Sequence, residues 1–226
     1  MLRFRTTCGL FSMAVLLATG ACGTTDAVRA TAGEPATSTS TTPPRVVSET
    51  AWTPFAASGP VTLTHPSSRV ERVAFHQSGH DGARQLAALP GAVAPTTLED
   101  RKRDTGPHGA VDVVVDPATE IRSPVTGRVK RAGRYVLYCT HSDDYVVIEP
   151  DDRPGWEVKI LHIDGVRVRA GNRVVAGQTV IAPRATQLPF ESQVDKVRTA
   201  DPAWPHVHIE VVDPSIPDRP TGPGCP

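Results

Sequence analysis

The segment Pro205-His206-Val207-His208-Ile209-Glu210-Val211-Val212 alternates polar and apolar side chains. Successive side chains of a β-strand point to opposite faces of its sheet. The alternation therefore predicts a strand over 206–212 that carries both histidines on one face.

The chain before this segment is also rich in short β-branched stretches that are separated by turn signals. No amphipathic helical period lasts beyond two turns, except weakly around Asp81–Leu89. We predict a mainly β domain, either a small antiparallel β-sandwich or an open barrel with long loops. The expected strands before 206–212 are Val70–Phe75, Val111–Val115, Gly127–Ala132, Tyr145–Glu149, Glu157–His162, Val174–Ala176 and Val180–Ala182.

Charge and composition exclude several classes of protein. Lys plus Arg total 24 in 226 residues, and Asp plus Glu also total 24. A nucleic-acid-binding protein needs a basic excess to displace the counterions of phosphate, so we expect no nucleic-acid partner. The 22 prolines and 18 glycines disfavour a bundle of long helices. No apolar run reaches the roughly 20 residues of a membrane-spanning helix.

The N-terminus has the pattern of a secretory signal: a basic start, about ten apolar residues and then small residues before Cys22. Thr19-Gly20-Ala21-Cys22 resembles a bacterial lipobox, which implies cleavage after residue 21 and lipidation of Cys22. The alternative is ordinary signal cleavage near Ala21, which would give a secreted protein. With lipidation, the protein is expected at the extracytoplasmic face of the cell membrane, attached through Cys22.

Two cysteines, Cys139 and Cys225, remain once Cys8 is removed with the signal and Cys22 is acylated. Two thiols in an oxidising compartment are expected to pair. The sequence therefore predicts a Cys139–Cys225 disulfide that closes a loop of about 86 residues and holds the Pro-rich tail against the domain.

Five polar residues form a pattern with chemical meaning. His108 and Asp112 are four positions apart at the start of a strand, and His162 ends an apolar strand. His206 and His208 share a strand face. Two histidines and a carboxylate with one open position are typical of a catalytic zinc site. Two further imidazoles could accept a proton from a water molecule and stabilise an oxyanion.

The stretch from His108 to Glu210 resembles the lysostaphin/LytM-type zinc metallopeptidases, which cleave peptide bonds of bacterial peptidoglycan. The resemblance rests on four motifs in the family's order: His-x-x-x-Asp at 108–112, Ser-Pro-Val-Thr-Gly-Arg-Val at 123–129, Val-x-x-Gly-x-x-Val-x-x-Gly-Gln at 168–178 and His-x-His-x-Glu at 206–210. Leu161-His162 supplies the family's lone histidine between the second and third motifs.

The resemblance implies one Zn²⁺ ion per chain, with His108, Asp112 and His208 as its ligands and His162 and His206 as the catalytic pair. It also implies an enzyme whose partners are peptidoglycan peptides. The implied organisation is a signal peptide over 1–21, a lipidated flexible tether over 22–59, an N-terminal extension over 60–107 that packs on the catalytic domain, the metallopeptidase domain over 108–213 and a Pro-rich tail over 214–226.

Two departures from the family pattern keep a second function open. Ile160 stands where the family has Tyr, and a longer insert, 179–205, replaces a Gly-rich segment. The alternative is a catalytically silent envelope lipoprotein that binds or regulates another cell-wall hydrolase.

Ser142-Asp143-Asp144 is expected to be a solvated turn, and Glu99–Asp104 an exposed loop that leads to the site.

His76 and His80 are expected in a polar loop. The alternatives are a second metal site or an inhibitory fourth ligand to the zinc.

Overall fold

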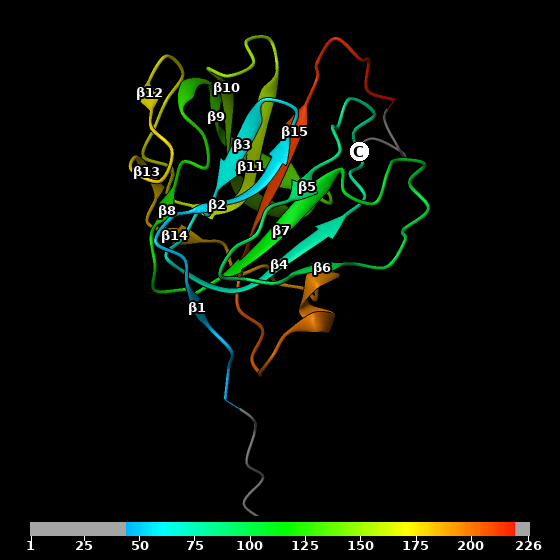
Figure 1. Cartoon of the computed structure of the whole chain (residues 1–226), viewed down its shortest axis with the longest axis vertical. Helices are drawn as coiled ribbons and strands as arrows, with labels where there is room; N and C mark the ends of the chain where they lie inside the picture. The colour runs from blue at the N-terminus through cyan, green and yellow to red at the C-terminus, as the bar shows by residue number, and fades with distance from the viewer. Residues whose placement is uncertain (1–43, 220–226) are drawn as a thin grey trace, which may run out of the picture. The chain divides into compact units, whose positions relative to one another are not determined.

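The computed structural model describes residues 44–219 and is built around one large, mainly antiparallel sheet (Figure 1). Its hydrogen-bonded order is β1-β4-β7-β15-β11-β10-β9-β12, with β6 added beside β4 and β14 beside β11. These strands span Ser48–Glu49 (β1), Arg69–His76 (β4), Pro95–Thr97 (β6), Ala110–Val115 (β7), Gly127–Leu137 (β9), His141–Pro150 (β10), Glu157–Asp164 (β11), Arg173–Val174 (β12), Arg184–Ala185 (β14) and His206–Val212 (β15).

Two smaller sheets complete the fold. One has the order β3-β2-β5 and the other pairs β13 with β8. None of the sheets in the described residues closes into a barrel, and the predicted mainly β, antiparallel, sandwich-like fold is confirmed. Seven of the eight strands predicted from the sequence are present, and the eighth, predicted over Val174–Ala176, is replaced by the shorter β12 at Arg173–Val174. The strands of the small sheets span Pro54–Ser58 (β2), Val61–Thr64 (β3), Ala87–Ala88 (β5), Ile121–Arg122 (β8) and Val180–Ala182 (β13).

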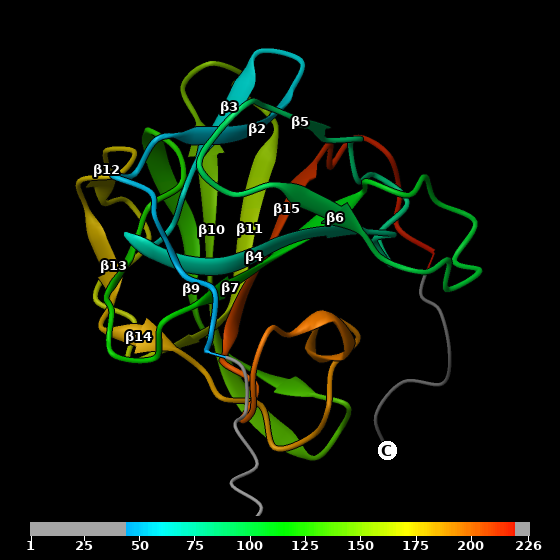
Figure 2. The same cartoon turned by 60° about the horizontal axis from the view of Figure 1, so that its bottom comes forward.

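The main core lies between the large sheet and these small sheets. Strand alternation sends Val207, Ile209 and Val211 of β15 into this core, where each is fully buried. Phe55 and Leu63, from the β2–β3 hairpin, pack into the same cluster. Figure 2 shows this hairpin over one face of the large sheet. The opposite face of the sheet is therefore left for polar side chains.

A second, smaller apolar cluster covers part of that opposite face. Ala74 of β4 and Val114 of β7 pack there with Leu98 and with Val194 of a short 3₁₀-helix, η1 (Val194–Val197). The predicted insert 179–205 thus contains η1 and packs on the sheet. Figure 2 shows this segment, in orange, near the end of the β9–β10 hairpin.

The predicted boundaries at 59 and 107 were wrong. Residues 48–58 form β1 and β2, although they were expected in the tether. Residues 60–107 do not pack on a finished domain, because their strand β4 pairs with β7 along six residue positions and belongs to the main sheet. Short strands that draw their stability from partners far away in sequence leave only a weak local signal.

Two motif glycines serve backbone geometry. A side chain at Gly127 would place its Cβ atom 2.1 Å from the carbonyl oxygen of Glu149 on the neighbouring strand, which excludes any larger residue without a backbone shift. Gly177 adopts a φ of +65°, in the left-handed region that glycine tolerates best. These two glycines are therefore required by the backbone geometry of the domain and take no direct part in the site.

Several predictions concern residues 1–43 and 220–226, which lie outside the described part of the chain. They are the signal peptide, the lipidation of Cys22 and most of the tether. Cys139 is disulfide-bonded, but Cys225 lies outside the described residues, so the predicted pairing stays a prediction. Within 44–219 no helix is long and apolar enough to cross a membrane.

One buried histidine gives the fold a dependence on pH. His65 is 1% exposed, stacks on Phe55 with ring centroids 4.7 Å apart, and neither of its ring nitrogens has a hydrogen-bond partner. Burial lowers the pKa of His65 to about 4. The unfolded chain, with a pKa near 6.5, binds this proton more readily than the folded one.

We expect the free energy of unfolding to fall as the pH drops from about 6.5 towards 4, with His65 accounting for about 2 kcal/mol of the loss by pH 5. Urea unfolding of the parent and of His65→Leu at pH 7 and pH 5 measures this share. The variant should lose less stability than the parent over this interval. Equal losses would show that His65 does not contribute.

Candidate metal centre and pocket

Strand β15 carries the site on the face that looks away from the main core. His206, His208 and Glu210 alternate with the core residues of β15, as predicted. The register places Asp112 of β7 directly opposite His208 and places Ala74 of β4 opposite Asp112. Three adjacent strands thus bring their polar residues to one region of the sheet.

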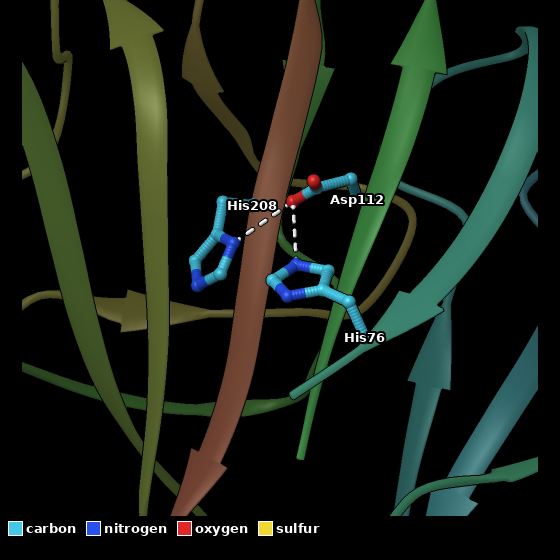
Figure 3. Close-up of side chains that lie close together, drawn as sticks. All are labelled: His76, Asp112 and His208. Carbon is cyan, nitrogen blue, oxygen red and sulfur yellow. Dashed lines mark hydrogen bonds and ion pairs between the residues drawn. The ribbon is translucent and has the colours of Figure 1, made fainter. Parts of the chain in front are cut away.

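The cluster that could hold a metal ion consists of His76, Asp112 and His208 (Figure 3). One donor atom from each residue lies within 4.8 Å of the others. Asp112 Oδ1 is 2.8 Å from His208 Nδ1 and 3.1 Å from His76 Nε2. His76 Nε2 is buried, and its contact with Asp112 lacks the geometry of a hydrogen bond, as expected for a nitrogen positioned to bind a metal. Two imidazoles and a carboxylate fit zinc and similar divalent ions.

The predicted ligand His108 does not join this cluster. Its Nδ1 lies 3.1 Å from the carbonyl oxygen of Leu86 and its Nε2 lies 3.0 Å from Thr97 Oγ1, so both ring nitrogens have partners elsewhere. The ring packs against Phe75 at 4.8 Å. His108 precedes β7 in a turn, so the strand alternation that would have aimed it at Asp112 does not reach it. The structure brings His76 to that position instead.

Both histidines of the cluster have a partner for their second ring nitrogen. His76 Nδ1 lies 2.9 Å from the carbonyl oxygen of Gln77, and His208 Nε2 lies 3.2 Å from Glu210 Oε1. Ser78 Oγ donates to the same oxygen of Glu210 at 2.6 Å. Such outer partners fix the tautomer and ring orientation of metal-binding histidines. The fit therefore extends beyond the three donor atoms.

The electrostatics of the cluster favour a bound cation. Burial alone would raise the pKa of Asp112, but the neighbouring His76, His206 and His208 hold it well below its usual range. Burial alone would lower the pKa of His208, but hydrogen bonds to Asp112 and Glu210 raise it to about 10. Buried carboxylates that stay ionised need a compensating positive charge, which a proton on His208 or a metal ion can supply.

His162 reaches the site through a β-bulge in β11. Leu161 pairs with Tyr145 and Ile163 pairs with Asp144, so His162 is an extra residue without an opposite partner on β10. Its φ of +62° lies in the left-handed region, which His tolerates better than most residues do. The bulge resets the alternation: Leu161 and His162 both line the pocket, and Ile163 returns to the core. Bulges often aim side chains in this way next to active sites.

A buried carboxylate holds His162 in place. Asp143 Oδ2 lies 2.6 Å from His162 Nδ1 and accepts the backbone N–H of His162 at 3.1 Å and the hydroxyl of Tyr135 at 2.8 Å. Burial alone would raise the pKa of Asp143, but these hydrogen bonds, led by that from His162, lower it. An ionised Asp143 favours a proton on Nδ1 of His162 and leaves Nε2 free to act as a base.

His206 completes the group of imidazoles. Its ring centroid is 5.0 Å from that of His162, and its Nε2 is 3.9 Å from Asp112 Oδ2. Burial lowers the pKa of His206 to about 4, so its ring is neutral at pH 7 and carries one N–H donor. The structure therefore places four of the five predicted residues together, with His76 as the fifth in place of His108.

A cavity of about 360 Å³ opens above these residues. His76, Asp112, His162, His206 and His208 all line it. Its walls come from the end of β9, from loop 98–107 and from the insert 179–205. The predicted exposed loop at 99–104 does lead to the site and contributes Arg101 and Arg103 to the pocket lining, whereas the insert contributes five residues, Leu188 and Phe190–Gln193.

Three functional candidates were not assigned their roles from the sequence, although metal binding by His76 was one of the alternatives considered for its loop. His76 was expected in a loop but ends β4, and Asp143 was expected in a solvated turn but is buried in β10. Glu210 belonged to a recognised motif without an assigned role. One signal for His76 was available: it follows the apolar strand Val70–Phe75 directly, as His162 follows Leu161. No local signal marks Asp143, because its partner is 19 residues away.

Comparisons of the chain with models of protein families, with curated proteins and with solved structures gave no match. The roles of these residues are therefore argued from their geometry.

His76→Ala should weaken Zn²⁺ binding by more than about 100-fold, because even loss of an outer partner of a metal ligand costs 10- to 100-fold. His108→Ala should bind Zn²⁺ as the parent does. Isothermal titration of the metal-depleted proteins measures both, with circular dichroism to confirm folding. The reverse ranking would return the ligand role to His108.

Proposed function

We propose that this protein is a zinc-dependent endopeptidase that hydrolyses peptide bonds of bacterial peptidoglycan. The observation that carries the proposal is the cluster of His76, Asp112 and His208 on the wall of a pocket that two further histidines also line. The order of the sequence motifs supports the choice of substrate. The lipobox-like N-terminus supports a place at the extracytoplasmic face of the membrane, where that substrate lies.

The donor set supports zinc as the cofactor. Two imidazoles and one carboxylate with an open side match the ligands of catalytic zinc sites. His76, Asp112 and His208 would hold the ion, and the chemistry it would supply there is Lewis-acid polarisation of the scissile carbonyl and a lowering of the pKa of a water molecule to about 7. Zinc binding would require His208 to release the proton that Asp112 and Glu210 stabilise on its ring. Gln77 O and Glu210 Oε1 face the opposite nitrogen of each ring, which orients His76 Nε2 and His208 Nδ1 towards the metal position.

The residues around the cluster have separable tasks. His162 accepts a proton at Nε2, while Asp143 holds the proton at Nδ1 and fixes the ring. His206, neutral and buried, offers an N–H group that can stabilise negative charge on the carbonyl oxygen as the tetrahedral centre forms. The apolar pocket residues, including Leu161 and Leu188, exclude water around the reacting bond.

One observation favours the second candidate, a silent module that regulates another hydrolase. The family's Tyr is replaced by Ile160, and this residue is fully buried in the main core. No hydroxyl group therefore reaches the site from this position. The complete set of histidines and Asp143 outweighs this loss, since a silent module has no need for a positioned base.

The purified full-length protein, loaded with zinc, should release peptide fragments from peptidoglycan, as detected by mass spectrometry. His208→Ala should abolish both zinc binding and release. His162→Asn should keep zinc and lose turnover by about 100-fold or more, and Asn tolerates the left-handed backbone at this bulge. Absence of any product from protein with one zinc per chain would favour the regulatory module.

Asp143→Asn tests the positioning of His162. Because the amide cannot stabilise a positive imidazole, we expect kcat to fall by about 100- to 10,000-fold, with KM and zinc content nearly unchanged. Steady-state kinetics and metal analysis provide the readout. Asp144→Asn serves as the neighbouring control, since Asp144 contacts Arg134 at 3.2 Å and not His162. A change in KM alone would contradict the positioning role.

A further inference from the structure

The pocket contains two positively charged side chains that form no ion pair with the residues of the site. Arg101 and Arg103 both line the cavity that contains the histidines. Among residues 44–219, neither guanidinium forms an ion pair with a carboxylate, although most other arginines of the domain do. The acidic wall residue Glu191 is already paired with Arg198 at 3.3 Å.

The backbone next to these two arginines adopts an unusual conformation. Lys102 and Asp104 have φ values of +55° and +58°, in the region that side chains other than glycine rarely adopt. Arg103 lies between them, and Asp100 Oδ1 accepts the N–H of Lys102 at 2.6 Å. Such strain persists only where the surroundings enforce it, and it concentrates at functional sites.

The residue that holds the loop in this conformation is Gln77, which directly follows His76 of the metal cluster. The side chain of Gln77 accepts the backbone N–H of Arg101 at 2.7 Å and donates to the carbonyl oxygen of Thr105 at 3.0 Å. Its own carbonyl oxygen faces both His76 Nδ1, at 2.9 Å, and Arg103 Nη1, at 3.1 Å. The arginine loop is therefore fixed to the residue that follows a proposed metal ligand.

The two charges also repel each other. Burial and then the neighbouring Arg101 lower the pKa of Arg103. Glu210 and Asp112 act in the opposite direction and only partly offset this effect. A bound anion beside the two guanidinium groups would stabilise them further. A guanidinium fork binds a carboxylate through two parallel hydrogen bonds, which favours this group over a neutral amide.

We propose that Arg101 and Arg103 form a subsite for a carboxylate of the substrate, so that the enzyme selects acidic peptides over their amidated forms. This inference rests on the proposed function and names its substrate class. The pocket lining also includes two aromatic side chains, Tyr138 and Phe190, in edge contact with ring centroids 5.4 Å apart. A peptide that carries a free carboxylate and small apolar side chains is complementary to both kinds of lining residue.

Binding rather than turnover tests this subsite. The probes are the stem tetrapeptide L-Ala-γ-D-Glu-L-Lys-D-Ala and the same peptide with both carboxylates converted to amides. Calorimetry uses the zinc-loaded full-length protein with His162→Asn, so that the peptides are not consumed. The acid should bind at least about 10-fold more tightly than the amide, as expected for charge-assisted hydrogen bonds.

Arg101→Gln should reduce this preference to about twofold or less, and its side chain makes no hydrogen bond in the described structure that folding would lose. Arg167→Gln, which removes an exposed arginine outside the pocket, should keep the preference. Arg103→Lys should weaken the preference while keeping the charge, because an ammonium lacks the fork.

Equal binding of the two peptides by the zinc-loaded His162→Asn protein, or no binding of either, would overturn the subsite. A preference that survives Arg101→Gln would also overturn it, since the metal itself would then be binding the carboxylate. None of these outcomes depends on catalysis. Failure of the subsite is therefore distinguishable from failure of the hydrolase proposal, which the release of peptide fragments decides separately.

Discussion

The carboxylate of Asp112 is the interaction on which the rest of the site depends. It is 6% exposed and contacts His208 and His76 through one oxygen, while its second oxygen faces His206. A buried charge is costly unless groups around it compensate, so the surrounding strands are constrained to bring imidazoles or a cation to it. The pairing of β4, β7 and β15 fulfils this constraint. The register places His208 opposite Asp112, and His76 and His206 lie two positions from the residues that pair with Asp112, on the same face of the sheet.

The two faces of the large sheet have different roles, because one face packs into the main core and the other carries the polar residues of the site. Along β15, valine and isoleucine enter the main core and the alternate positions carry His206, His208 and Glu210. On β11 the regular alternation would have turned His162 into the core, and the bulge prevents this. The strain at His162 is offset by hydrogen bonds to Asp143 from both its ring and its backbone.

The segments between the strands form the pocket walls and therefore determine which molecules can enter the pocket. Loop 98–107 is joined to the cluster through Gln77, and the insert 179–205 is joined to that loop through Gln193, whose side chain donates to the carbonyl oxygen of Glu99 at 2.8 Å. Both segments pack on the site face of the sheet through Leu98 and Val194. The pocket wall is thus one connected structure, so a substitution in the insert can alter the position of Arg101 without touching the metal cluster.

The sequence by itself determined the mainly β fold, seven strands of clear β-branched pattern and four of the five imidazole and carboxylate positions at the site. These follow from local rules, because alternation within a strand fixes which side chains share a face. Only the tertiary structure decided that His76 rather than His108 joins Asp112, that Asp143 holds His162 and that residues 48–107 belong to the domain. Each of these depends on a strand pairing or a bulge between segments distant in sequence, and spacing along the chain does not encode such contacts.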